Sequence, residues 1–129
     1  MNTPTQPETM KTAIQALSTA APHEAPDALA RIPYDALGDD YRRSPEAACR
    51  KALRITRSLK NRPNRRLRAI NRLLGMHGVE AVQEKNGELA FTYSNSGDTY
   101  TCTVILYASG TFRVTSWGDI VERNMNRFA

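Results

Sequence analysis

The clearest structural pattern in this 129-residue chain lies in residues 79–116, VEAVQEKNGELAFTYSNSGDTYTCTVILYASGTFRVTS. Apolar and polar residues alternate along it, as Leu89, Phe91 and Tyr93 do between polar or small neighbours. A period of two residues is typical of strands with one buried face. The Asn86-Gly87 pair favours a tight hairpin, and further short turns separate the later runs. The stretch therefore predicts a four-stranded antiparallel β-meander.

Two amphipathic helices are predicted before the meander. Ser44, Pro45 and Glu46 form a typical helix start, with a hydroxyl cap, a proline in the first turn and an acid near the positive end of the helix dipole. Apolar residues then recur at helical spacing from Pro45 to Lys60, namely Ala48, Ala52, Ile55 and Leu59. A break follows at 61–63, and a second helix is predicted after it, up to residue 74. Its apolar residues would face inward, namely Leu67, Ile70, Leu73 and Leu74.

Helices followed by a meander indicate the α+β class, with the helical pair packed on one face of the sheet. Residues 1–26 are expected to form a flexible or weakly helical N-terminal segment, with a short helix over 8–20. Residues 27–129 are expected to form a single α+β domain. It would contain basic helices at 44–75, an antiparallel sheet at 79–116 and a C-terminal turn at 117–129, where Asp119 would cap a short helical turn.

Charge is distributed unevenly along the chain, whose net charge is +5. Twelve Lys and Arg residues fall between Arg42 and Arg72 with one acid, Glu46, so this segment carries +11. The rest has six basic and twelve acidic residues, which is a net charge of −6. Such a basic segment predicts a polyanionic partner, because charges of both signs normally alternate on a merely solvated face.

Arginines of the two helices are the predicted contacts with that partner. At helical spacing they form two rows, and a planar guanidinium donates paired hydrogen bonds to a phosphate. If the helices lie side by side, the rows would form one cationic surface that binds a phosphate backbone. The predicted nucleic-acid or polyanion contacts are Arg50, Lys51, Arg54, Arg57, Arg65, Arg68 and Arg72.

Three aromatic residues are the second set of candidate contacts. Tyr93 and Tyr107 have polar neighbours and are expected to be exposed, where they could stack on a base or touch a partner. Trp117 stands beside a glycine at a strand end, so it could either close the core or serve as a contact. The competing interpretation is that the aromatic residues of the sheet form core and cross-strand pairs.

Several function classes find no support in the sequence. The N-terminus lacks the basic start and apolar run of a secretory signal, and no run of apolar residues is long enough to span a membrane, so a cytoplasmic location is expected. Cys49 and Cys102 are too far apart for a metal-ligand pair and are expected to be reduced thiols. Asp98 and Asp119 could pair at a metal in a nuclease, but acids beside glycine are ordinary turn chemistry. We therefore predict a non-enzymatic protein without metal or cofactor.

Residues 97–100 and 112–119, Gly-Asp-Thr-Tyr and Phe-Arg-Val-Thr-Ser-Trp-Gly-Asp, carry a resemblance to known proteins. This region resembles small uncharacterised proteins of phages and bacterial mobile elements. The resemblance implies no particular activity and assigns no functional residue. It implies a context in which small proteins counter host defence by stoichiometric binding, as anti-CRISPR inhibitors do.

Two hypotheses of function follow. The first is an accessory protein that binds nucleic acid or another polyanion through the arginine-rich helical pair. The second is an anti-defence inhibitor whose arginines bind an acidic or nucleic-acid-handling protein. An edge strand of the meander would also allow pairing with a second copy, which makes a homodimer a further expectation.

Overall fold

The computed structural model describes residues 6–33, 37, 45–75, 79–85, 87–95 and 98–122, with the backbone alone at 6–9, 45, 80–85, 94–95 and 117–122. The elements along the chain are α1 (Gln6–Thr19), α2 (Ala25–Ala30), α3 (Pro45–Ile55), the 3-10 helix η2 (Thr56–Leu59), α4 (Pro63–Gly75), β1 (Val79–Lys85), β2 (Glu88–Asn95), β3 (Asp98–Leu106) and β4 (Phe112–Glu122). The α+β class and the antiparallel sheet are confirmed. The predicted cap at Ser44 lies outside the described residues.

The sheet follows chain order, β1-β2-β3-β4, and each neighbouring pair is antiparallel. The predicted C-terminal turn is wrong at 117–122, because β4 continues there as a strand. Ile120 pairs with Tyr100, and Glu122 pairs with Thr99. The start of β3 offers backbone partners to these residues. The pairing register shifts on either side of Trp117, so the two strands stay paired through this irregular region. Residues 123–129 lie outside the described residues.

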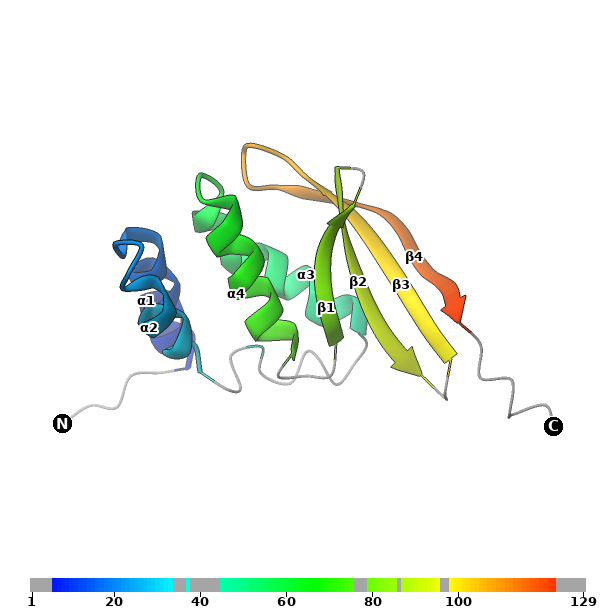
Figure 1. Cartoon of the computed structure of the whole chain (residues 1–129), viewed down its shortest axis with the longest axis horizontal. Coiled ribbons are helices and arrows are strands. Elements are labelled where there is room, and N and C mark those ends of the chain that lie inside the picture. Colours follow the sequence, from blue (N-terminus) through cyan, green and yellow to red (C-terminus); the bar gives the residue numbers. More distant parts are fainter. Residues whose placement is uncertain are drawn as a thin grey trace.

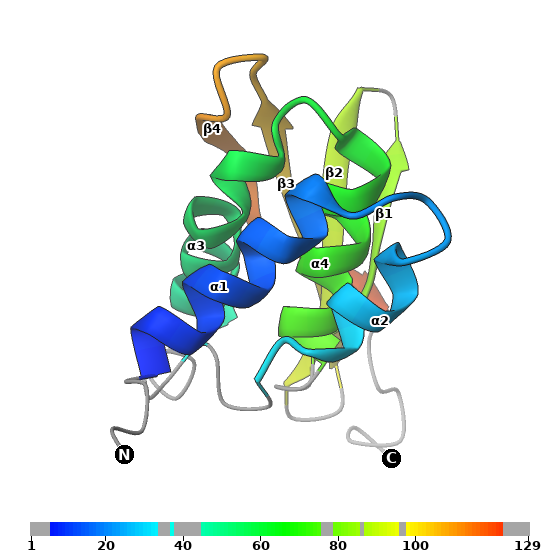
Figure 2. The same cartoon turned by 90° about the vertical axis from the view of Figure 1, so that its left-hand side faces the viewer.

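The elements form three layers, which Figures 1 and 2 show from two sides. The sheet is one layer, and α3 and α4 lie side by side against one of its faces. On the other side of this pair, α1 packs on η2 and α4, and α2 lies beside α4 (Figure 2). The helical pair is therefore sandwiched between the sheet and the N-terminal helices, and only part of its surface remains open to solvent.

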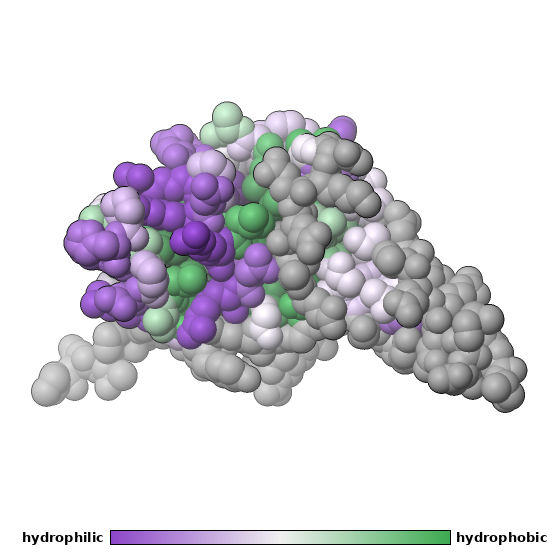
Figure 3. All heavy atoms as spheres, in the orientation of Figure 1, coloured by the Kyte–Doolittle hydropathy of each residue, from purple (hydrophilic) through white to green (hydrophobic). Residues whose placement is uncertain are grey.

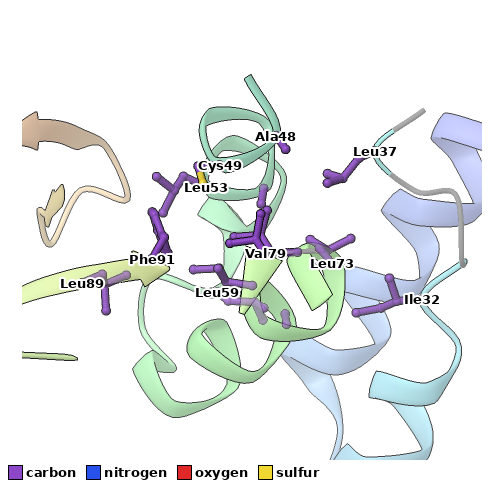
Figure 4. Close-up of a cluster of buried hydrophobic side chains, with 14 of the residues drawn as sticks. Ile32, Leu37, Ala48, Cys49, Leu53, Leu59, Leu73, Val79, Leu89 and Phe91 are labelled. Atoms are coloured by element: carbon purple, nitrogen blue, oxygen red, sulfur yellow. The ribbon is translucent and has the colours of Figure 1, made fainter. Parts of the chain in front are cut away.

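One hydrophobic core connects all three layers (Figure 4). Phe91 of β2 and Leu53 of α3 meet at its centre, and neither is exposed to solvent. Ile14 and Leu17 of α1 belong to the same core, although the expected helix at 8–20 was poor in apolar residues. Ala13 of the same helix is buried with them, so α1 is an integral part of the fold.

The first basic helix is shorter than the single helix predicted for Pro45–Lys60. It ends at Ile55, and a 3-10 turn follows. The Thr56 hydroxyl donates to the carbonyl of Ala52 at 2.9 Å, and Arg66 donates to the carbonyl of Leu53 at 2.9 Å. The Thr56 hydroxyl bonds to the preceding turn, and Arg66 bonds to a helix carbonyl from outside the helix. Both interactions favour the change from α-helix to 3-10 helix at this point.

Candidate nucleic-acid interface

The arginine row on α3 and η2 is partly neutralised within the protein. Arg50 donates from Nε and Nη2 to Oε1 of Glu46, at 2.9 and 2.8 Å, in a pair four residues apart on the helix. Lys51 is half-buried. Arg54 and Arg57 are exposed, and neither forms a hydrogen bond or ion pair with another described residue. Arg54 and Arg57 are therefore the members of this row that remain open to an outside anion.

The row on α4 is more open. Arg65 is half-buried and donates from Nη1 to the carbonyl of Leu17 at 3.0 Å, which ties α4 to α1. Arg68 and Arg72 are exposed, and neither has a hydrogen-bonding or ionic partner among the described residues. The seven-residue separation between Arg65 and Arg72 corresponds to roughly 10 Å along the helix axis.

Arg54 of the first row and Arg68 of the second line different cavities, and α1 contributes residues to both. Arg54 lines a cavity of about 310 Å³ on one side of α1, with Met10 and Ile14. Arg68 lines a cavity of about 260 Å³ on the other side, with Leu17 of α1. In Figure 2, α1 runs diagonally across the helical layer. Arg57 of the first row lies beside Lys60 at the β3–β4 turn. One cationic face shared by both rows stays a prediction, and α4 offers two exposed arginines, Arg68 and Arg72.

Arg66 differs from its neighbours because it is buried, with 3% of its surface exposed. Its Nη2 donates to the carbonyls of Leu53 at 2.9 Å and Gly110 at 3.0 Å, and its Nε donates to the hydroxyl of Thr56 at 3.3 Å. These bonds join α3, α4 and the β3–β4 turn. Desolvation, and secondly the charge of Arg57, lower the pKa of Arg66. Arg66 is therefore a structural cation rather than a surface one.

A signal in the sequence could have revealed this role. Arg66 lies three, four and seven residues before Ala69, Ile70 and Leu73, all of which are fully buried. At this spacing Arg66 shares the inward face of α4. The +11 total counts it equally with the exposed arginines, although its charge is directed into the protein.

The connection between η2 and α4 adds basic residues that the predicted set omitted. Lys60 and Arg62 are exposed, and no described residue forms a hydrogen bond or ion pair with either side chain. The β3–β4 turn lies against this region, since a Cβ placed on Gly110 would be 2.6 Å from Cγ of Arg57 and 3.4 Å from Cδ of Lys60. Hydrophilic side chains gather over α4 and α2 in Figure 3. We call the following residues the α4 basic surface: Lys60, Arg62, Arg68 and Arg72.

The three aromatic candidates have different environments. Tyr93 is 8% exposed and stacks on Tyr100, with ring centroids 5.5 Å apart and an interplanar angle of 18°, so its predicted exposure is wrong. Its position on the inward face of β2 places it against the core, and burial raises its pKa. Tyr107 is 44% exposed, as expected. Trp117 pairs with Cys102 through its backbone, and its side chain lies outside the described residues.

Other kinds of site are not evident in the part of the chain that the structure describes. It contains no cluster of three or more His, Cys, Asp or Glu side chains that could hold a metal ion. Within the same residues, no helix is both long and apolar enough to cross a membrane. Comparison with protein families, curated proteins and solved structures finds no match to this chain. The resemblance to mobile-element proteins therefore stays a prediction.

Proposed function

We propose that this protein binds nucleic acid through the α4 basic surface, with the phosphate backbone as the main ligand. The supporting observation is that Lys60, Arg62, Arg68 and Arg72 are exposed and have no carboxylate partner among the described residues. Exposed cations that have no acid nearby can bind the phosphates of a nucleic acid. Each such contact releases counterions condensed on the nucleic acid, and this release favours binding. Arg54 on the far side of α1 contributes only to a ligand that wraps around the helices.

Salt dependence tests this proposal directly. Four phosphate contacts give a slope of about −3 to −4 in a plot of log affinity against log salt. Between 50 and 200 mM KCl, fluorescence anisotropy with labelled DNA and RNA should therefore show an affinity loss of about 100-fold. An affinity that stays constant over this range, or an absence of binding at 50 mM, contradicts the proposal.

Charge reversal locates the surface. Arg68→Glu should weaken binding by at least about tenfold and reduce the salt slope by at least about 1. The matched control is Arg113→Glu, which changes the net charge equally on the exposed side of β4, between Phe112 and Val114, which face the core. Equal losses in the two variants would show that net charge alone drives binding and would overturn the assignment to α4.

An acidic protein is the alternative ligand for the same cations. Purified tagged protein, incubated with bacterial lysate with and without nuclease, separates the two. Under the proposal, nuclease digestion releases the captured material. A single stoichiometric protein that stays bound after digestion, and is lost in Arg68→Glu, would instead support the inhibitor hypothesis.

A further inference from the structure

A cavity of about 230 Å³ lies next to the α4 basic surface, between the start of α4, the start of β2 and the end of β3. Lys60 and Asn64 line it from the helical side, and Tyr107 lines it from the sheet side. Its remaining wall includes the apolar side chains of Leu67 and Leu106. In Figure 3, hydrophobic residues show beside the hydrophilic surface over α4. The cavity therefore combines an apolar interior with a cationic rim.

Tyr107 is the distinctive residue of this cavity. Among the described residues, it is the one large apolar side chain that is exposed. Its backbone is held by the β3–β4 turn, because Tyr107 N donates to the carbonyl of Thr111 and Gly110 N donates to the carbonyl of Tyr107, both at 2.9 Å. Because the turn already fixes the Tyr107 backbone, stacking a base on this ring requires less ordering than stacking on a ring in a flexible loop would.

The polar groups around the ring suit a nucleotide. Lys60 supplies an exposed ammonium group, which can contact a phosphate as a point charge. The side-chain amide of Asn64 carries donors and an acceptor, which can meet the edge of a base. Arg66 also lines the cavity, and its guanidinium donates to a hydroxyl and to two neutral carbonyls, so none of these partners neutralises its positive charge.

We propose that this cavity takes one unpaired nucleobase, stacked on Tyr107, while the adjoining phosphates lie along Lys60 and the rest of the α4 basic surface. The inference rests on the proposed function and narrows its ligand to single-stranded or looped nucleic acid. A base within a duplex is stacked and paired on both sides, so it cannot enter the cavity without leaving the helix. Stacking on an aromatic side chain accepts any base, so little sequence preference is expected.

The first test uses the unaltered protein with three labelled 12-nucleotide probes: a single strand, its duplex, and the same single strand with abasic residues in place of every nucleoside. Fluorescence anisotropy at 50 mM KCl measures each affinity. The single strand should bind about tenfold more tightly than its abasic form, which keeps the phosphates but lacks the bases. Equal affinity for the normal and abasic strands would overturn the inference while leaving the proposed function intact.

The second test uses Tyr107→Ala and Tyr107→Phe. The alanine variant should lose about tenfold in affinity for the single strand and keep its affinity for the duplex, whereas phenylalanine should preserve both. Unchanged duplex binding also reports that the variant is folded. If the alanine variant loses affinity for both the single strand and the duplex, or for neither, the stacking role of Tyr107 is contradicted. Failure of the unaltered protein to bind any of the three probes would overturn the proposed function as well.

Discussion

The inward and outward faces of α4 carry the same residue type in opposite roles. Arg66 on the inward face is buried and donates to carbonyls of α3 and the β3–β4 turn. Arg68 and Arg72 on the outward face are exposed and have no ionic partner among the described residues. The density of charged residues in a sequence is therefore not a measure of the charge that a ligand can contact. The phase of each residue on its helix decides whether its charge faces solvent.

The largest effect is expected at the buried arginine. Arg66→Ala should lower the free energy of unfolding by about 3 kcal/mol, because it removes the guanidinium donor to the buried carbonyls of Leu53 and Gly110 and opens a cavity. Urea unfolding measures the change. The matched control is Arg68→Ala, which should leave the unfolding midpoint nearly unchanged. If both variants lose the same stability, the contrast between the two faces does not hold.

The next largest effect on stability is expected in the β3–β4 turn, where the Gly110 carbonyl accepts a hydrogen bond from Arg66. Gly110 has φ +92°, and a Cβ there would be 2.6 Å from Cγ of Arg57 and 3.1 Å from its carbonyl oxygen. Gly110→Ala should therefore cost about 2 kcal/mol in unfolding free energy, from backbone strain together with the close contact. Gly87→Ala is the control, since Gly87 has φ +79° and nothing within 4 Å of a Cβ. Its cost should be about 1 kcal/mol, and a thermal melt that ranks Gly87→Ala as the more harmful would contradict this interpretation.

Alkaline pH tests the inward face of α3. Burial, with smaller contributions from Cys102 and Glu46, raises the pKa of Cys49 to about 12 from 9.0. A folded-state pKa above the unfolded value means that the stability is present below about pH 9 and falls as pH rises toward 12. The expected loss is about 1.4 kcal/mol per pH unit within this window. Urea unfolding at several pH values should show this slope, and Cys49→Ala should reduce it. The raised pKa of Tyr93 adds to the loss above that group's ordinary value of 10.0.

The smallest effect concerns the neutralised arginine on the outward side of α3. Glu46→Gln removes the carboxylate that pairs with Arg50, at a cost of about 0.3–0.5 kcal/mol in stability. The freed guanidinium should raise nucleic-acid affinity about twofold at 50 mM KCl and steepen the salt dependence slightly. Anisotropy titrations against the unaltered protein measure this change. A decrease in affinity would show that the Glu46 carboxylate itself orders the surface.

Much of the fold was predictable because local patterns report local structure. The alternation through Leu89, Phe91 and Tyr93 marked a strand, and Leu89 and Phe91 do face the core. The same alternation placed Tyr93 on the inward face, yet its polar neighbours suggested exposure, and the strand phase proved the better guide. The extension of β4 to Glu122 was not predictable from Gly118 and Asp119, because it depends on pairing with the start of β3.

The candidate site was predictable only in part. Arg68 and Arg72 are exposed as expected, but Arg50 is paired with Glu46 and Arg65 is tied to the backbone of α1. Lys60 gained its importance from the cavity it shares with Tyr107, a residue 47 positions later in the chain. The spacing of residues along the chain cannot predict that these two distant residues line the same cavity.

By itself, the sequence determined the class of the fold, the positions of the two basic helices and the excess of positive charge between Arg42 and Arg72. These properties follow from residue type and from the periods of helices and strands, which act over a few residues. Three further properties arise only in the folded chain: which cations face solvent, that Arg54 and Arg68 line different cavities beside α1, and that Tyr107 and Lys60 line the same cavity. Those outcomes depend on how distant segments exclude water from one another, and burial is a property of the packed chain rather than of any stretch within it.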